Sequence, residues 1–303
     1  MNRLPDELLL FIFSQNELWK KDRMVFLDVC QRWRRVIGDR SLWHEKYLTE
    51  QEAARLFSVL PLDMPLRLEI NKPGKIRRPV MRELLARATH VKWYNWTLME
   101  RYLAPNVMYS QLTHVHVWSR DPNQLAPLLD RLAGHLRVLF ILSRRNDKNQ
   151  PMDAFAASMD KCTQLTHLGL SDVNCRGGVP TGNMPHLMYF ASYGSSLSTA
   201  AQLLFRNPPL LRYFYVDDPM GVAYFSLWEK MMDSHRLKGF SIGIHTPWPY
   251  FSPTHAQQAQ QLEHHLKTHY PNAQQVELNI NGRRAISYAC TGWFDFDSID
   301  EAK

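Results

Sequence analysis

One pattern recurs along the chain from residue 88 onward: apolar-x-x-apolar-x-apolar, the spacing of a short strand with alternate residues buried. Successive copies start 22 to 29 residues apart, except for a last interval of 36 residues. The copies begin at Ala88, Leu112, Leu136, Leu165, Leu187, Leu211, Leu237 and Ala273. A strand that returns about every two dozen residues predicts a repeat architecture, in which each unit buries its apolar face against its neighbours.

Helix signals lie between the strand motifs. Asp121-Pro122, Asp218-Pro219 and Ser252-Pro253 each combine an N-cap residue with proline at the first helical position. After the first of them, leucines at 125, 128, 129 and 132 form one stripe. Strand, turn and helix at this spacing predict an α/β fold, a curved parallel sheet with helices outside. The pattern resembles irregular leucine-rich repeats, although only Asn174 and Asn281 come near the usual asparagine position. A non-solenoid α/β domain remains the alternative.

The first 48 residues read as three short helices. Leu4 to Ser14 begins with Pro5 and two acidic residues, which suit a helix N-terminus. Its apolar residues surround the helix almost completely, so it needs cover on more than one side. A second helix is predicted over Met24–Ile37, and a short third helix starts at Ser41. So small a unit is near the lower limit for independent stability.

These residues resemble the F-box family. The resemblance covers residues 3–48 and is carried by Leu-Pro-x-Glu-Leu-Leu-x-x-Ile-Phe-Ser, then Val-Cys-Gln-Arg-Trp-Arg, then Ser-Leu-Trp. It implies docking on the Skp-type adaptor of an SCF ubiquitin ligase, and through that adaptor on cullin. The matching positions place Leu4, Pro5, Leu8, Leu9 and Ile12 on the docking surface, whereas Trp33 and Trp43 either join the helices or reach the adaptor. The usual leucine-rich run before Val-Cys is replaced by residues 21–27. An unrelated helical bundle is the alternative.

The expected domains are therefore an F-box at residues 1–48, a helical linker at 49–87 and an irregular leucine-rich-repeat-like domain at 88–303. The linker contains several prolines, and short helices are predicted near Glu50–Leu60 and Val80–Arg87.

Composition excludes several other classes of protein. The net charge is +7, but much of the excess is a basic stretch between residues 72 and 92, which reads as a solvated face and makes nucleic acid an unlikely partner. Four cysteines without a CxxC pair indicate neither zinc nor disulfides, and suggest a reducing compartment, cytoplasmic or nuclear. No signal peptide or membrane-spanning run is expected, because the longest unbroken apolar run has six residues.

No enzyme motif is recognisable either. The sequence lacks a phosphate-binding glycine loop, HExxH and a nucleophile elbow. His264, His265 and His269 are spaced for one helix face, but no further ligand accompanies them, and exposed helix histidines are the commoner explanation. We therefore expect no catalytic residue, metal or cofactor.

The strand positions that alternate with the buried residues are unusually rich in tyrosine, histidine and phenylalanine. In a repeat arc they face away from the helices. They are His90, Lys92, His114, His116, Val138, Phe140, His167, Gly169, Tyr189, Tyr213, Tyr215, Gln275 and Glu277. A row formed by His167, Tyr189, Tyr213 and Tyr215 is the predicted target-binding site. Coverage of these rings by loops or by the C-terminal tail is the alternative.

The sequence thus favours a substrate-recognition subunit of an SCF-type cullin–RING ubiquitin ligase, which catalyses nothing itself. Its repeat arc would hold an unidentified target protein close to the ubiquitin-charged enzyme. The runner-up is an adaptor-bound interaction protein that directs no ubiquitylation. An enzyme with a site among the histidines comes last.

Overall fold

The computed structural model describes residues 4–15, 20–44, 46–71, 76–94, 102–103, 109–119, 121–143, 153–171, 184–193, 210, 213–218, 239–244, 264, 268 and 276–280. The chain divides into two compact units, residues 1–115 and residues 116–303.

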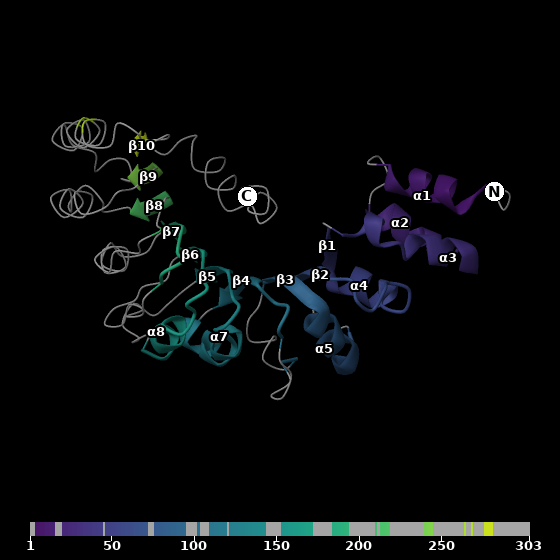
Figure 1. The fold of residues 1–303 in the computed structure, drawn as a ribbon, viewed down its shortest axis with the longest axis horizontal. Helices are drawn as coiled ribbons and strands as arrows, with labels where there is room; N and C mark the ends of the chain where they lie inside the picture. Colours follow the sequence, from purple (N-terminus) through teal and green to yellow (C-terminus); the bar gives the residue numbers. More distant parts are fainter. Residues whose placement is uncertain are drawn as a thin grey trace. The chain divides into compact units, whose positions relative to one another are not determined.

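The first unit starts with helices α1 (Asp6–Ser14), α2 (Lys20–Phe26) and α3 (Gln31–Ile37), followed by the 3-10 turn η1 (Arg40–Leu42) (Figure 1). The single helix predicted over Met24–Ile37 is wrong, because Cys30 is extended and separates α2 from α3. The interruption exposes the Leu27 carbonyl, which accepts a 3.1 Å hydrogen bond from Nε of Arg34. The short third helix is present as η1, where the Asp39 carboxylate accepts a hydrogen bond from the backbone of Ser41.

Before residue 114, the first unit also contains three parallel strands: β1 (Tyr47–Thr49), β2 (Leu66–Ile70) and β3 (Ala88–Trp93). Helices α4 (Glu50–Leu56) and α5 (Arg78–Arg87) pack against each other and against β2. A capping box starts α4, with the Thr49 hydroxyl and the Glu52 carboxylate each accepting from the other's backbone N–H.

Residues 49–87, expected as a helical linker, contain both predicted helices and also strand β2. Part of this range therefore belongs to the sheet. Thr49 is the last residue of β1, which pairs in parallel with β2, and β2 pairs in parallel with β3. The expected division into three domains is a statement about which parts fold independently. Strand pairing does not test independent folding, so the division stays a prediction.

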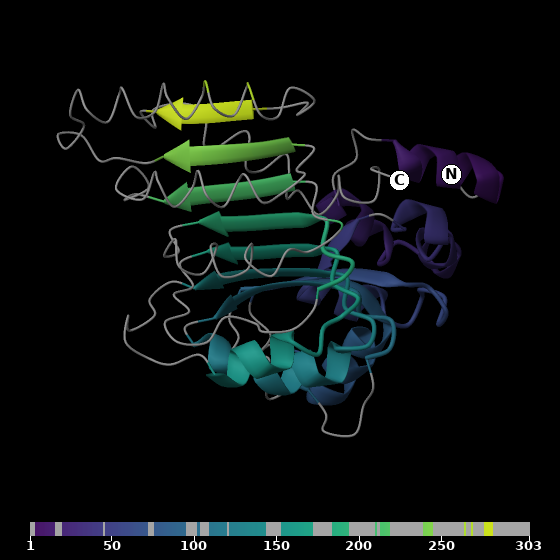
Figure 2. The ribbon, with the colours of Figure 1, turned by 60° about the vertical axis from the view of Figure 1, so that its left-hand side comes forward.

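The boundary between the units falls within β4 (His114–Ser119). The second unit continues with η3 (Pro122–Leu125), α7 (Ala126–Leu132), β5 (Val138–Ser143), α8 (Asp153–Met159), β6 (His167–Ser171), β7 (Tyr189–Tyr193), β8 (Tyr213–Asp218), β9 (Gly239–Ile244) and β10 (Val276–Ile280). Strands β5 to β10 pair in parallel in chain order, and Figure 2 shows their arrows in register. Each strand coincides with one copy of the sequence motif. The predicted α/β class, with a parallel sheet and helices, is confirmed.

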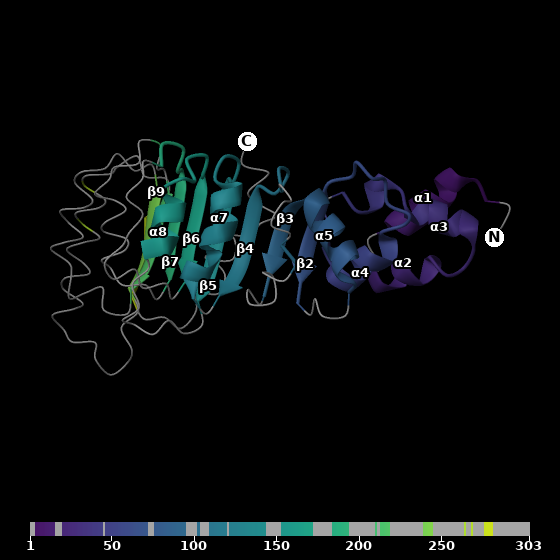
Figure 3. The same cartoon turned by 90° about the horizontal axis from the view of Figure 1, so that it is seen from below.

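One face of the second unit's sheet is the core face. Helices α7 and α8 lie side by side on it (Figure 3), and the predicted leucine stripe of η3 and α7 is fully buried there. Asp121 caps η3 through its side chain, as its sequence position predicts. Leu139, Leu168 and Phe190 occupy equivalent register positions on β5, β6 and β7 and are buried. The residues that alternate with these buried ones along each strand therefore point to the opposite face of the sheet, which we call the outward face.

Candidate docking surfaces

Helix α1 carries apolar side chains on two opposite sides. Leu9 is 1% exposed, and Phe13 is equally buried, so both belong to the interior. Leu8, Phe11 and Ile12 are 48%, 64% and 41% exposed, respectively. Their i, i+3, i+4 spacing places them together on one helix face. We call these three residues the α1 apolar face.

The inward side of α1 packs on an aromatic cluster. The ring of Phe13 is 4.7 Å from that of Phe26 and 5.2 Å from that of Trp33, and the last two rings are also 5.2 Å apart. Nε1 of Trp43 donates a 2.6 Å hydrogen bond to the Ile37 carbonyl. Both tryptophans are buried. They join the helices, which is one of the two roles that the sequence left open.

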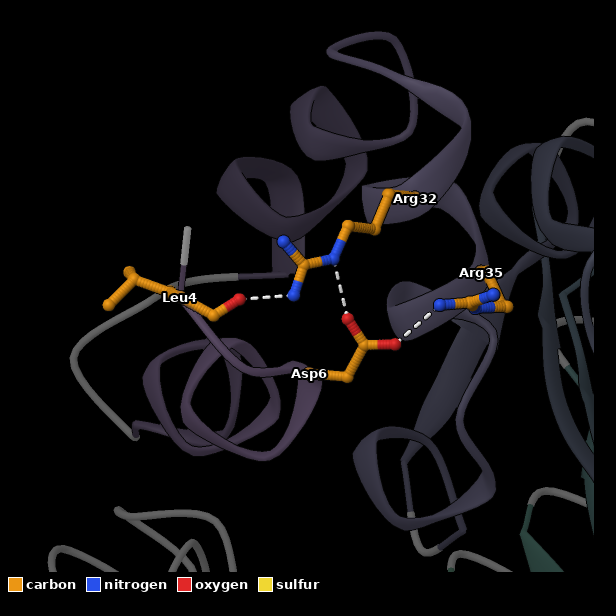
Figure 4. Close-up of polar contacts among 4 residues, drawn as sticks. All are labelled: Leu4, Asp6, Arg32 and Arg35. Atoms are coloured by element: carbon orange, nitrogen blue, oxygen red, sulfur yellow. Dashed lines mark hydrogen bonds and ion pairs between the residues drawn. The ribbon is translucent and has the colours of Figure 1, made fainter. Parts of the chain in front are cut away.

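The start of α1 is tied to α3 by a carboxylate between two arginines (Figure 4). Nε of Arg32 lies 2.6 Å and Nη2 of Arg35 lies 2.5 Å from the Asp6 carboxylate, and Arg32 also donates to the Leu4 carbonyl. Hydrogen bonds from Arg32, and then from Arg35, hold the pKa of Asp6 below its usual value. Leu4 and Pro5 are therefore held next to the α1 apolar face.

The predicted adaptor-binding set stays a prediction, and its members differ in exposure. Leu8, Ile12 and Pro5 are exposed and Leu4 is half-buried, as a docking surface requires. Leu9 instead packs inward, because a helix at the edge of a bundle must bury one side within its own domain. Phe11, which the predicted set does not include, is exposed on the same helix face as Leu8 and Ile12. Its position three residues after Leu8 was the available signal.

In the first unit, four side chains on strands β1, β3 and β4 form a cluster that we call the histidine cluster: Tyr47, His90, Lys92 and His114. The rings of His90 and His114 stack at 3.9 Å, and the ring of Tyr47 meets His90 edge-on at 6.4 Å. Nζ of Lys92 sits 3.9 Å above the Tyr47 ring. Burial, followed by the charges of His114, Arg67 and Lys92, lowers the pKa of His90 to about 2. His90 is therefore neutral at pH 7.

On the outward face of the second unit, four rings form the ring cluster: His116, Phe140, His167 and Tyr189. His116 meets Phe140 edge-on at 4.6 Å, and His167 stacks on Tyr189 at 4.2 Å with an interplanar angle of 8°. The Phe140 ring lies over Gly169, where an added Cβ would come within 2.1 Å of Cδ2. Glycine at this position therefore lets Phe140 lie flat against the sheet.

A Thr-His pair recurs at the start of three strands and accounts for the orientation of their histidines. The pairs are Thr89-His90, Thr113-His114 and Thr166-His167, with Nδ1 to Oγ1 distances of 2.9, 2.8 and 2.8 Å. Each hydroxyl also donates to a carbonyl on the preceding repeat, that of Leu66, Thr89 or Arg137. Because the hydroxyl has one proton, it accepts from Nδ1–H of the ring. In the neutral form, each of these three rings therefore carries its proton on Nδ1.

The predicted target-binding row is continuous in the backbone register. His167 is aligned with Tyr189, and Tyr189 with Tyr213, whereas Tyr215 is aligned with Ala191. His167 is only 8% exposed and Tyr189 is half-buried, so Tyr189 is the more accessible of the two. The side chains of Tyr213 and Tyr215 lie outside the described part of the structure. A role for the row in target binding stays a prediction.

His264 is exposed, while His265 and His269 lie outside the described residues. Across the part of the chain that the structure describes, histidine, cysteine and acidic side chains nowhere gather in threes to hold a metal ion. The longest helix in that part, α5, has 10 residues, against about 20 needed to span a membrane, and no membrane-spanning helix is found there.

Comparison with known families identifies the N-terminal helices. Residues 1–49 match the family model described as F-box-like. The first part of the chain is therefore an F-box-like domain, as its motifs indicated.

No curated protein sequence matches the chain. Among solved structures, one similar chain comes from the crystal structure of the Rad7 and Elc1 complex in yeast. The TM-score is 0.37 and the identity 12%, over 79% of this chain and 69% of that chain. A similarity this low assigns no role to the present protein.

Proposed function

We propose that this protein is a non-catalytic substrate-recognition subunit of a cullin–RING ubiquitin ligase. Its F-box-like domain docks on a Skp-type adaptor, and its sheet binds the target protein. The observation that carries the proposal is the α1 apolar face, three large apolar side chains exposed on one side of a helix within the F-box-like domain.

The α1 apolar face suits a protein partner in both energy and rigidity. Full burial of a leucine, isoleucine or phenylalanine side chain contributes roughly 1.5–3 kcal/mol. Leu8, Phe11 and Ile12 lie on a helix whose start is bound to α3 and whose inward side packs on Phe26 and Trp33. A preorganised face loses little conformational entropy on binding. Free in water, the same face predicts poor solubility without the adaptor.

The ring cluster supports a separate site for the target. Aromatic side chains offer a large contact area and lose little conformational entropy, which suits recognition of an extended peptide or loop. Tyr189 and Tyr213 are aligned on adjacent strands about 5 Å apart, so the row extends from the described ring cluster onto β8. Such a row runs across the strands, so a peptide bound along it would lie over several repeats.

Reconstitution tests the first half of the proposal. The full chain, co-expressed with a Skp-type adaptor, cullin and its RING subunit, should elute as one complex. Supplied with ATP and the ubiquitin-activating and ubiquitin-conjugating enzymes, that complex should support transfer of ubiquitin to a co-captured protein. A complex that contains adaptor and cullin but ubiquitylates no captured protein would favour the alternative, an interaction protein without a ligase role. Stable, monodisperse free protein that gains nothing from the adaptor would contradict the docking itself.

The target site is tested by removing two rings. Tyr213→Ala combined with Tyr215→Ala should weaken target capture by more than about 2 kcal/mol while adaptor binding stays intact. Quantitative mass spectrometry after affinity capture measures both effects in one sample. Unchanged recovery of targets by the folded double variant would contradict a target site on this face.

A further inference from the structure

Arg23 is an enclosed cation that links two elements of the F-box-like domain. It lies on α2 and is 1% exposed. Its guanidinium donates to the carbonyls of Ser14 at 3.5 Å, Gln15 at 3.2 Å and Leu42 at 3.5 Å. Among the described residues, its Nε has no hydrogen-bond partner.

An arginine in this position carries a cost that a leucine would not. The guanidinium stays charged in proteins, so burial opposes the charge without removing it, which here lowers the pKa of Arg23. Carbonyl groups compensate part of that cost, provided that they are held at the right geometry. The fork of the guanidinium is suited to binding several carbonyls at once. The geometry of Ser14, Gln15 and Leu42 is therefore coupled to Arg23.

Two of the three carbonyls belong to the end of α1. A helix C-terminus has unpaired carbonyls and partial negative charge, which a cation stabilises. The same turn is bound further by Oγ of Ser14 and Nε2 of Gln15, which donate to the Phe11 carbonyl at 2.8 and 2.9 Å. The Gln15 backbone donates to the Ile12 carbonyl at 3.3 Å. Arg23 thus acts on the turn that presents Phe11 and Ile12.

We propose that Arg23 is a positioning residue for adaptor docking, an inference that rests on the proposed function. It sets the orientation of the last turn of α1, and with it the direction of Phe11 and Ile12. Asp6, held by Arg32 and Arg35, does the same for the start of the helix. The α1 apolar face is therefore fixed at both ends by arginines from neighbouring helices, and the buried one acts on the end that carries the exposed ring of Phe11.

The test compares Arg23→Met, which keeps the length of the side chain but removes its donors, with Arg23→Lys, which keeps the charge and fewer donors. Arg34→Met is the matched control, because Arg34 also donates to a backbone carbonyl, that of Leu27, but touches no part of α1 in the hydrogen bonds above. Two quantities are measured on the full chain: the Kd for the purified adaptor by calorimetry, and amide exchange of residues 11–15.

We expect Arg23→Met to bind the adaptor at least tenfold more weakly and to exchange faster at residues 11–15, with Arg23→Lys between it and the wild type. Arg34→Met should bind within twofold of the wild type. A folded Arg23→Met variant that binds within twofold, or an equal loss in Arg34→Met, overturns the inference. Should Arg23→Met fail to fold, the same two measurements on Arg23→Lys decide.

Failure of the proposed function gives a different result. A wild-type chain that does not bind the adaptor contradicts the docking proposal, while amide exchange still tests the role of Arg23 in ordering α1. In that case, unchanged exchange at residues 11–15 in Arg23→Met overturns the inference, and faster exchange supports it.

Discussion

The outward side of α1 and the outward face of the sheet both carry large apolar or aromatic side chains. These side chains are exposed on α1, whereas on the sheet they pack against one another. On α1, the side chains of Leu8, Phe11 and Ile12 lie on one helix face and are exposed to solvent. On the sheet, rings cover one another: His90 stacks on His114, and His167 on Tyr189. A strand places its side chains about 5 Å from those of the next strand, so neighbouring rings meet, whereas a lone helix face has no such neighbour.

Under the proposed function, the difference corresponds to two kinds of binding. In the proposed complex, the adaptor covers the α1 apolar face, so docking there should contribute strongly to affinity and solubility. The sheet face is already packed, so a target would bind to the edges and hydroxyls of an ordered surface.

The largest effect is expected at α1. Leu8→Asp combined with Ile12→Asp would bury two unpaired charges in the adaptor interface, at a cost of several kcal/mol, and should reduce adaptor affinity by at least about a thousandfold. Calorimetry with purified adaptor measures the change. Leu62→Asp is the control, since Leu62 is a 76% exposed leucine outside α1. Equal losses in both variants would show that adaptor docking is not specific to the α1 apolar face.

The two sides of α1 should separate stability from docking. Leu9→Ala removes a fully buried side chain and should lower the free energy of unfolding by about 2–5 kcal/mol. Leu8→Ala should change it by less than about 0.5 kcal/mol, because surface truncations are usually small. Urea denaturation of both variants gives the comparison. Similar losses of stability would mean that Leu8 is covered within the chain itself.

The ring cluster offers a steric test. Gly169→Ala places a Cβ 2.1 Å from the Phe140 ring, so the ring must shift, and overpacking of this kind costs about 1–3 kcal/mol. Gly134→Ala is the matched control, because an added Cβ there meets no atom within 4 Å. Thermal unfolding reports the difference. Equal stability of the two variants would show that Phe140 moves freely and that the sheet face is less ordered than its contacts indicate.

The last prediction concerns pH. The pKa of His90 falls from 6.5 to about 2 on folding, so below pH 6.5 the unfolded chain binds a proton that the folded chain does not. The stability contributed by neutral His90 is complete above pH 6.5 and is lost as the pH falls towards 2, by at most about 1.4 kcal/mol per pH unit. Amide exchange of β3 between pH 7 and pH 5 measures this slope.

His90→Phe keeps a ring beside His114 and should flatten the acid slope. His44→Phe, at an exposed histidine of the same unit, controls for the loss of an imidazole. A slope that His90→Phe leaves unchanged would place the acid-sensitive group elsewhere.

Several elements were predictable because a few residues decide them locally. The apolar-x-x-apolar-x-apolar motif located strands β3 to β10, since strand burial has a short period that a sequence displays directly. Strands β1 and β2 were missed. Leu66, Leu68 and Ile70 alternate as a strand should, but prolines at 61 and 65 suggested a linker. The break at Cys30 was also missed, because no proline or glycine marks it.

The candidate docking surface was half predictable. The F-box motif located α1 and named Leu8 and Ile12, but motif matching cannot tell an inward leucine from an outward one. Leu8 and Leu9 are adjacent and chemically identical, and only the packing of α1 against α3 and η1 decides that Leu9 turns inward. The exposure of Phe11 and the burial of Arg23 were not predicted for the same reason, since both depend on neighbouring helices.

The sequence by itself determined the order of the parts and the spacing of the strands, because hydrophobic period and turn residues act over a few positions. The three Thr-His pairs are also present in the sequence, but the hydrogen bonds that they form were not predicted from it. Only the tertiary structure decided which side of α1 is exposed and which rings stack. It also decided where an arginine is enclosed by the carbonyls of Ser14, Gln15 and Leu42. These outcomes depend on distances between residues that are far apart along the chain, and burial is set by the packing of all neighbours together.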